Sequence, residues 1–136
     1  MENKRLIIYT DGGARGNPGP AGIGAVLYDE EKNVIAEVSE FIGKATNNQA
    51  EYRAVIAAIK KAKILKAEEL LFYLDSELVV KQLNREYRVK NKDLAPLFVK
   101  VYNAVLNFKK VSFFHVRREF NKEADALANK AIDELL

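Results

Sequence analysis

The sequence predicts an α/β fold in which helices flank a mixed five-stranded sheet, with the elements in the order βββαβααβα. Short apolar segments that suit buried strands alternate with longer segments whose apolar residues recur every three or four positions. Clusters of glycine, proline and charged residues separate these segments. The chain has 136 residues, of which 49% are hydrophobic and 30% charged. This length and composition predict one globular domain, residues 1–136, with its own core.

Three strands are expected in the N-terminal third of the chain. Residues 5–10 form a nearly continuous apolar run, which is typical of a strand covered on both faces. The run ends at Asp11, and the glycine- and proline-rich segment that follows predicts a loop. Residues 22–28 and 33–42 indicate two strands joined by a charged turn, and therefore an antiparallel hairpin.

The rest of the chain alternates helices with two further strands. Pro96 suits the first turn of a helix, because its missing N–H would have no partner there in any case. The expected elements are a helix over 48–63, a strand over 70–74 that ends in Asp75, a helix over 76–83, a polar and basic loop over 84–93, a helix over 96–108, a strand over 111–116 and a helix from Asn121 to the end of the chain.

Composition narrows the classes of function. The chain has no cysteine, which excludes disulfides and thiolate metal sites, and a single histidine, His115, on which any Ser–His–Asp triad would depend. No apolar run reaches the roughly 18 residues of a membrane span, and the N-terminus has no signal-peptide pattern. A cytoplasmic protein without membrane contact is therefore expected. The sequence carries no signal for oligomeric state, so a monomer is the default expectation. The net charge of +3 gives a mild indication of a polyanionic partner.

Four acidic residues each have an ordinary structural explanation. Asp11 could begin a turn. Glu51 lies three residues after Asn48, the spacing of a capping box. Asp75 could cap the helix that follows it, and Asp125 lies in the first turn of a helix, where the dipole favours an acid.

Taken together, the positions of the four acids favour a shared site. Helical periodicity aims Glu51 into the core-facing stripe that also holds Val55, Ala58, Ile59 and Ala62, whereas Arg53 and Lys60 point away. Burying an ionised carboxylate is costly unless it is paired or binds a metal. In the last helix, Asp125 lies next to Ile132 at the edge of an apolar stripe formed by Ala124, Leu127, Ala128, Ala131 and Leu135.

Asp11 and Asp75 both follow buried strands, and ligands of open α/β sheets bind at the carboxyl ends of parallel strands. If these strands are neighbours, the two carboxylates emerge side by side and repel each other unless a divalent cation lies between them. Hard oxygen ligands favour Mg²⁺ or Mn²⁺. Two such ions about 3.5–4 Å apart orient a phosphodiester for in-line displacement. The residues alone therefore predict phosphoryl transfer without naming the substrate.

Four segments resemble one known family in their order and spacing, and together they span nearly the whole chain. They are YTDGGARGNPGPAGIGAVL (9–27), TNNQAEYRAVIAAI (46–59), LDSELVVKQL (74–83) and NKEADALANKA (121–131). The family that they resemble is type 1 ribonuclease H (ribonuclease HI), in the form without the basic protrusion.

The resemblance implies a ribonuclease H-like fold and an endonuclease that hydrolyses the RNA strand of RNA–DNA hybrids, leaving 5′-phosphate and 3′-hydroxyl ends. It implies two Mg²⁺ or Mn²⁺ ions held by the catalytic acids Asp11, Glu51, Asp75 and Asp125. Double-stranded RNA stays open as a second substrate. Asn17 and Thr46 would hold a DNA phosphate, and backbone amides near the RNA strand would allow 2′-hydroxyls to be recognised. The full set of substrate contacts would be Gly12, Gly13, Ala14, Asn17, Thr46, Asn47, Asn48, Glu77, Lys90 and Asn91.

Two features depart from many members of that family. The loop 117–121 has no histidine where relatives carry one, and our hypothesis is that Arg118 takes over part of its role by attracting the scissile or leaving phosphate. A solvated arginine is the alternative, and His115 is expected to be structural. The segment 84–93 is too short for the basic helix that some relatives insert. Hybrid affinity should then be modest and salt-sensitive, and should rest on Arg85, Arg88, Lys90, Asn91 and Lys92. Glu77 stands where relatives often have glutamine.

Two other functions compete with this interpretation. An integrase- or transposase-like enzyme could share the fold, but the glycine-rich segment after Asp11 and the Thr-Asn-Asn before Glu51 argue against it. A nucleic-acid-binding module without catalysis is the second. The intact set of four acids argues against that module, because negative charge facing phosphate weakens binding.

Overall fold

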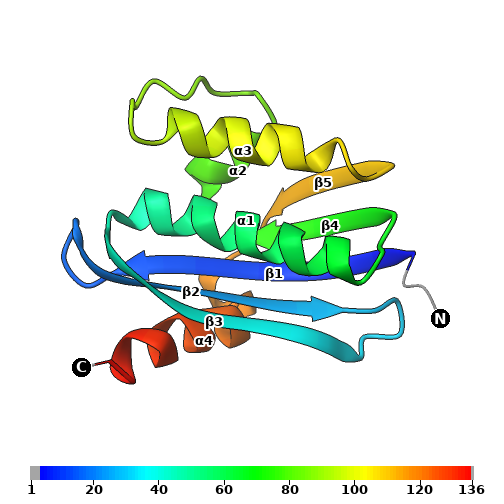
Figure 1. Cartoon of the computed structure of the whole chain (residues 1–136), viewed down its shortest axis with the longest axis horizontal. Helices are drawn as coiled ribbons and strands as arrows, with labels where there is room; N and C mark the ends of the chain where they lie inside the picture. The colour runs from blue at the N-terminus through cyan, green and yellow to red at the C-terminus, as the bar shows by residue number, and fades with distance from the viewer. Residues whose placement is uncertain (1–3, 136) are drawn as a thin grey trace.

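The computed structural model describes residues 4–135, which form a five-stranded sheet in the order β3-β2-β1-β4-β5 (Figure 1). Strands β1, β2 and β3 pair antiparallel, whereas β4 runs parallel to both β1 and β5. This confirms the predicted mixed sheet. The elements are β1 (Arg5–Ala14), β2 (Gly19–Tyr28), β3 (Val34–Ala45), α1 (Asn47–Ile64), β4 (Glu69–Leu74), α2 (Glu77–Leu83), α3 (Ala95–Val105), β5 (Lys110–His115), a short 3₁₀ helix (Arg118–Phe120) and α4 (Lys122–Asp133).

Two helices cover opposite faces of the sheet. Helix α1 packs against β1 and β2 on one face, and α3 packs on α1 (Figure 1). Helix α4 packs mainly on β2 and β3 from the other face. Among residues 4–135, no helix has the length and apolar character that a bilayer span would need.

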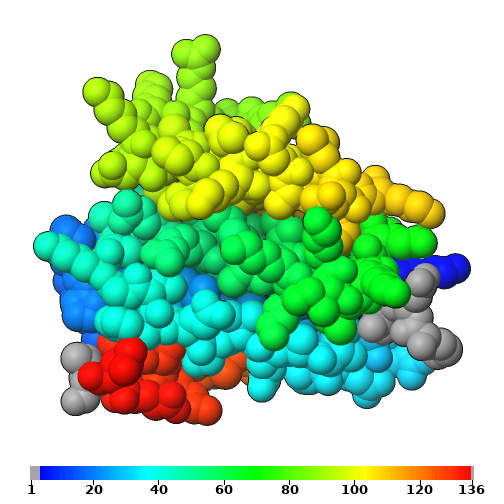
Figure 2. Space-filling view, in the orientation of Figure 1, coloured from blue at the N-terminus to red at the C-terminus, as the bar shows by residue number. Residues whose placement is uncertain are grey.

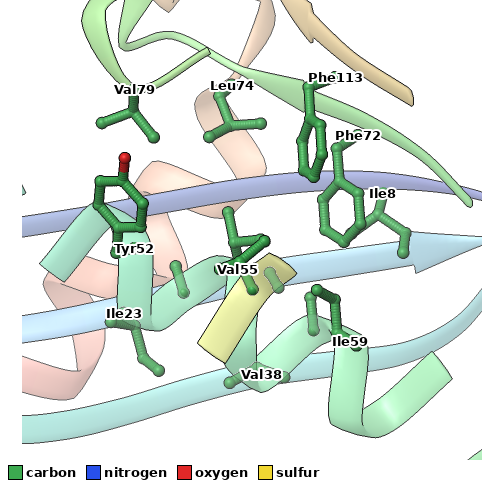
Figure 3. Packing of buried hydrophobic residues seen from close by; sticks show 14 of the residues in the cluster. Ile8, Ile23, Val38, Tyr52, Val55, Ile59, Phe72, Leu74, Val79 and Phe113 are labelled. Carbon is green, nitrogen blue, oxygen red and sulfur yellow. The ribbon is translucent and has the colours of Figure 1, made fainter. Parts of the chain in front are cut away.

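The main core lies between α1 and the sheet. Val55 and Ile59 of α1 lie on the side of Phe72 of β4 and Ile8 of β1, whereas Tyr52 of α1 points towards Val79 of α2 (Figure 3). All six side chains are buried. Val55 and Ile59 belong to the stripe that helical periodicity predicts, whereas Tyr52 is buried in addition to it. Burying side chains of this size contributes about 1.5–3 kcal/mol each. The same packing fixes the rotation of α1 and therefore the direction in which Glu51 points.

Helix α4 lies close against the sheet because β2 carries glycines beneath it. A Cβ at Gly24 would collide with the backbone oxygen of Ala124, and one at Gly22 would collide with that of Ala128. The Ser39 hydroxyl on β3 also donates to the Leu127 carbonyl at 2.7 Å. These contacts hold the first turns of α4, which carry Asp125, against the sheet.

Several boundaries differ from the sequence prediction, among them the start of β2 at Gly19 and the end of α3 at Val105. Strand β1 continues to Ala14, because residues 11–14 keep pairing with β2 although their composition indicates a loop. Strand β3 likewise extends to Ala45. Helix α4 ends at Asp133, so Leu135 lies outside the apolar stripe and its side chain is 62% exposed. The inclusion of Leu135 in that stripe was therefore wrong.

A row of aromatic rings crosses the sheet on the same face as α4, in the part of that face that α4 does not cover. Tyr28, Tyr9, Tyr73 and Phe114 come from β2, β1, β4 and β5 in turn. Tyr9 meets Tyr28 edge-on with 6.0 Å between ring centroids, and stacks on Tyr73 at 5.0 Å. Tyr73 stacks on Phe114 at 5.3 Å. Contacts of this geometry stabilise aromatic pairs beyond the area that they bury.

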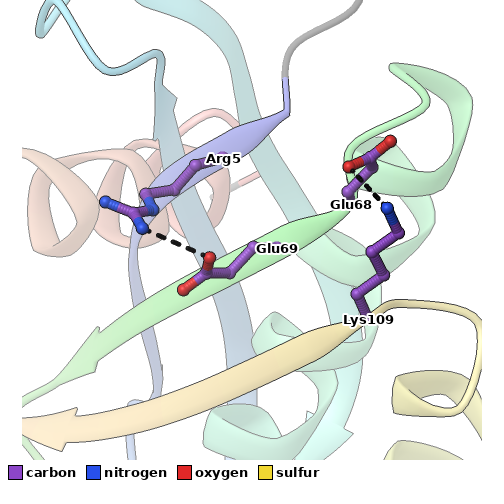
Figure 4. Close-up of polar contacts among 4 residues, drawn as sticks. All are labelled: Arg5, Glu68, Glu69 and Lys109. Atoms are coloured by element: carbon purple, nitrogen blue, oxygen red, sulfur yellow. Dashed lines mark hydrogen bonds and ion pairs between the residues drawn. The ribbon is translucent and has the colours of Figure 1, made fainter.

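Exposed ion pairs link the strands near the start of the parallel strands. Arg5 contacts Glu69 at 3.4 Å and Lys109 contacts Glu68 at 3.2 Å (Figure 4). Each such pair contributes about 0–1 kcal/mol. In the space-filling view, the segment 84–94 between α2 and α3 projects from the body of the molecule (Figure 2).

Candidate active site

The candidate site lies where β1 extends beyond its parallel neighbour β4. The last pair between these strands is Thr10 with Leu74. Asp11 and Asp75 are the next residues on each chain segment, so their side chains start from the same level of the sheet. The two strands are neighbours as the prediction required, although β1 itself continues past Asp11.

Helix α1 brings Glu51 to the step, the place where β1 extends beyond the end of β4, through a close contact with β1. A Cβ at Gly12 would collide with the carbonyl group of Ala50, so the helix backbone lies directly on the strand. Glu51 is 6% exposed, and its Oε1 accepts a hydrogen bond of 2.6 Å from the Gly12 N–H. The periodicity argument for Glu51 is therefore confirmed.

Three carboxylates converge at this point. Asp11, Glu51 and Asp75 each offer an oxygen atom, and these atoms all lie within 4.8 Å of one another. Asp125 lines the same cavity of about 380 Å³ but lies outside that group of three. Its Oδ1 accepts from Asn129 Nδ2 at 3.3 Å. The structure thus brings three of the four predicted acids within 4.8 Å of one another. The fourth, Asp125, lines the same cavity, and its carboxyl group contributes to the raised pKa of Asp11.

The ordinary explanations for two of these acids fail. Thr46, rather than Asn48, caps α1, and it forms its capping box with Gln49. Ser76, rather than Asp75, caps α2 by accepting from the Val79 N–H. Glu51 and Asp75 are thereby free of any capping role. Asp125 does lie in the first turn of α4, where the helix dipole favours an acid.

Burial and mutual repulsion make full ionisation of this cluster unfavourable. Burial raises the pKa of Asp11 far above its usual range, and the charges of Glu51 and Asp75 raise it further. Burial and the Asp75 charge also raise the pKa of Glu51, against the lowering effects of a hydrogen bond with Asp11, of the Gly12 N–H and of the Arg118 charge. A proton or a cation is needed among these oxygens. Oxygen-only donors of this kind fit Mg²⁺ or Mn²⁺.

These raised pKa values predict how stability depends on pH. The folded state holds protons on Asp11 and Glu51 more tightly than the unfolded state. Their contribution to stability is therefore complete below about pH 4 and is lost as pH rises towards the raised values. Without metal, we expect the melting temperature to fall between about pH 5 and pH 8. Added Mg²⁺ should restore it more at the higher pH, as calorimetry in chelator and in Mg²⁺ can measure. A flat profile would show that the cluster is not repulsive.

Comparison with known proteins identifies the family. The family described as "Reverse transcriptase-like" matches residues 9–131. A bifunctional protein of Mycobacterium tuberculosis is 44% identical over 95% of this chain, which covers 36% of that protein. The crystal structure of the RNase H1 of Halobacterium salinarum superposes with a TM-score of 0.93 at 42% identity, covering 96% of this chain and 98% of that one. The chain belongs to the ribonuclease H family.

A further ribonuclease H relative has been solved with nucleic acid. The structure of LC11-RNase H1 in complex with an RNA/DNA hybrid has a TM-score of 0.92 at 44% identity, and 96% of this chain matches 98% of that one. Some relatives are longer: this chain spans 36% of the mycobacterial protein and 65% of the curated ribonuclease HI of Halobacterium salinarum.

Part of the substrate contact set expected for a ribonuclease H surrounds the acids. Gly12, Gly13, Asn47 and Asn48 line the cavity, as does Arg118. Asn17, Asn47 and Ala14 are joined by hydrogen bonds. The Asn17 side-chain oxygen accepts from the Asn47 N–H at 2.9 Å, and that of Asn47 accepts from the Ala14 N–H at 2.8 Å. Each amide therefore turns its oxygen to the backbone and keeps its NH₂ group as a donor.

Other expected residues lie away from the cavity. Glu77, at the start of α2, pairs with Lys81 at 3.3 Å and lies 4.0 Å from His115. Lys90 and Asn91 are exposed in the projecting segment, where the Asn91 side chain accepts from the Asp93 N–H. The cavity does not include these residues, so their contact with a ribonuclease H substrate stays a prediction.

Sequence reasoning missed two residues at the site. Ser76 lines the cavity and caps α2; its place directly after Asp75 and before an apolar run was a usable signal. Asn121 is fully buried beside Asp75, whereas the sequence indicates it only as the start of the last helix. Local sequence holds no signal for that burial.

Proposed function

We propose that this chain is an endonuclease that hydrolyses the RNA strand of RNA–DNA hybrids with the help of two divalent metal ions. The observation that carries the proposal is the group of three carboxylates at the step between β1 and β4, in a chain that matches ribonuclease H relatives over nearly its whole length. The hybrid bound to LC11-RNase H1 supports the choice of substrate.

Asp11, Glu51 and Asp75 would hold the metal ions together with Asp125. Mg²⁺ or Mn²⁺ would supply Lewis acidity and lower the pKa of an attacking water. Contacts within the folded chain hold the acids in fixed positions. Glu51 is fixed by the Gly12 N–H, and Asp75 by its place at the end of a buried strand.

The proposed reaction forms a bond between a water oxygen and the phosphorus atom and breaks the bond from phosphorus to the 3′-oxygen. The downstream fragment then keeps a 5′-phosphate, and the upstream fragment leaves with a 3′-hydroxyl. The amide donors of Asn17 and Asn47, and the backbone at Gly13, would contact the hybrid next to the acids.

The proposal is tested by cleavage of an end-labelled RNA–DNA hybrid in Mg²⁺, in Mn²⁺ and in chelator. We expect cleavage only with metal, in the RNA strand, with the end groups given above. Double-stranded DNA and double-stranded RNA are assayed in parallel. Cleavage of double-stranded DNA would favour an integrase-like enzyme. Hybrid binding without cleavage in any metal would favour a binding module and overturn the proposal.

Arg118 gives a separate prediction. It is exposed yet lines the cavity, and its charge lowers the pKa of Glu51. If it attracts the scissile or leaving phosphate, Arg118→Ala should lower kcat by about 10–100-fold, because charge-assisted contacts of this kind contribute about 1.5–3 kcal/mol. Arg117→Ala is the matched control, because Arg117 pairs with Glu119 and does not line the cavity. Unchanged turnover of Arg118→Ala would remove the role.

A further inference from the structure

Asn121 has no local reason to be buried where it is. It occupies the N-cap position of α4, but its side chain makes no capping hydrogen bond. The residue is 0% exposed, and its Oδ1 has no partner within residues 4–135. A buried acceptor without a donor destabilises the folded state. An apolar side chain of similar size would avoid that cost, so packing alone does not explain an asparagine here.

The Asn121 amide joins two strands at the level of the acids. Its Nδ2 donates to the Thr10 carbonyl at 2.9 Å and to Asp75 Oδ2 at 3.2 Å. Thr10 belongs to the last residue pair of β1 and β4, and Asp11 follows it directly. The side chain therefore satisfies the β1 carbonyl just where pairing with β4 ends, and it holds one carboxylate oxygen of Asp75 in the same contact.

The Asn121 backbone reaches a third acid. Its carbonyl accepts the Asp125 N–H at 3.1 Å, the first hydrogen bond of α4. One buried residue is thus bonded to Asp75, to Asp125 and to the residue that precedes Asp11. These acids come from β1, from the end of β4 and from α4, which are distant in sequence.

We propose that Asn121 is a positioning residue that fixes Asp75 relative to Asp11 and Asp125 and thereby sets the metal affinity of the site. The inference rests on the proposed function, because it assigns Asn121 a role towards the same metal ions. Partners that orient metal-binding carboxylates affect metal affinity although they do not touch the metal.

Calorimetric titration with Mn²⁺ tests the proposal on wild type, Asn121→Leu and Asn121→Ala. We expect both variants to bind Mn²⁺ about 10–100-fold more weakly, with a lower kcat and an unchanged KM for the hybrid. Tyr52→Phe is the matched control, because it removes a buried hydrogen bond of 2.8 Å to Gln82 in which none of the four acids takes part. That variant should lose thermal stability but bind Mn²⁺ like wild type.

A folded Asn121→Leu variant with wild-type Mn²⁺ affinity and kcat would overturn the inference and leave the proposed function intact. A wild type that neither binds Mn²⁺ nor cleaves the hybrid would instead overturn the proposed function. If neither Asn121 variant folds, the inference is tested on the wild-type protein by NMR of its asparagine side-chain amides. The Asn121 NH₂ signals should exchange slowly and shift on Mg²⁺ addition, while those of Asn33 stay constant. Asn121 signals that do not respond to Mg²⁺ would overturn the inference.

Discussion

Replacing Asp11 with asparagine is expected to lower hybrid cleavage by about a thousandfold or more while the protein stays folded. A thousandfold loss corresponds to about 4 kcal/mol of transition-state stabilisation. Of the three carboxylates, Asp11 is the one that lies on a strand. It is buried, and its charge faces both Glu51 and Asp75. The neutral amide keeps the shape of the side chain and removes a negatively charged ligand.

The same substitution should raise stability when no metal is present. The repulsion that Glu51 and Asp75 exert on the Asp11 carboxylate, which raises the pKa of Asp11, disappears, so the melting temperature near pH 8 in chelator should exceed that of wild type. Single-turnover cleavage and calorimetry measure the two effects. Asp133→Asn is the control, because it removes one charge from an exposed acid of α4 whose partner is Arg15. An Asp11→Asn variant that still cleaves at a wild-type rate would exclude this residue as a metal ligand.

Of the proposed substitutions, Gly12→Ala is expected to cause the largest loss of folding stability. A methyl group at this position would collide with the backbone carbonyl of Ala50, and backbone cannot move aside as a flexible side chain does. Helix α1 would have to lift from β1 and separate Glu51 from the Gly12 N–H. Overpacking of this kind costs about 1–3 kcal/mol, occasionally more. We expect urea unfolding to show such a loss, together with loss of cleavage.

Gly13→Ala provides the matched stability control. A Cβ there would meet only the Asn47 side-chain oxygen, at 3.9 Å, which is ordinary contact. Its unfolding midpoint should stay close to that of wild type. Equal destabilisation by the two substitutions would mean that the strand, and not the helix contact, is sensitive to a side chain.

Much of this architecture could be predicted because it rests on local periodicity. The stripe from Glu51 to Ala62 and the apolar strands that precede Asp11 and Asp75 are visible in sequence, and they were enough to bring three acids to one edge of the sheet. The predicted hairpin of β2 and β3 also formed.

The errors arose where distant backbone decides the structure. Residues 11–14 look like a loop because glycine favours turns, yet they pair with β2 through main-chain hydrogen bonds that do not depend on side chains. Thr46 and Asn48 are both good capping residues, so sequence could not choose between them. The burial of Asn121 depends on β1, β4 and α4 meeting at one point, which no local pattern encodes.

The aromatic row on the sheet provides a circular dichroism signal by which folding of the chain can be followed. The protein contains six tyrosines and no tryptophan. Three of those tyrosines lie in the row, on β2, β1 and β4. The contact between Tyr9 and Tyr73 forms only after β1 and β4, which are far apart in sequence, have come together. Near-ultraviolet circular dichroism should therefore follow closure of the sheet, whereas the far-ultraviolet signal also records helix formation. The time between the two signals during refolding would separate local from long-range assembly without any added label.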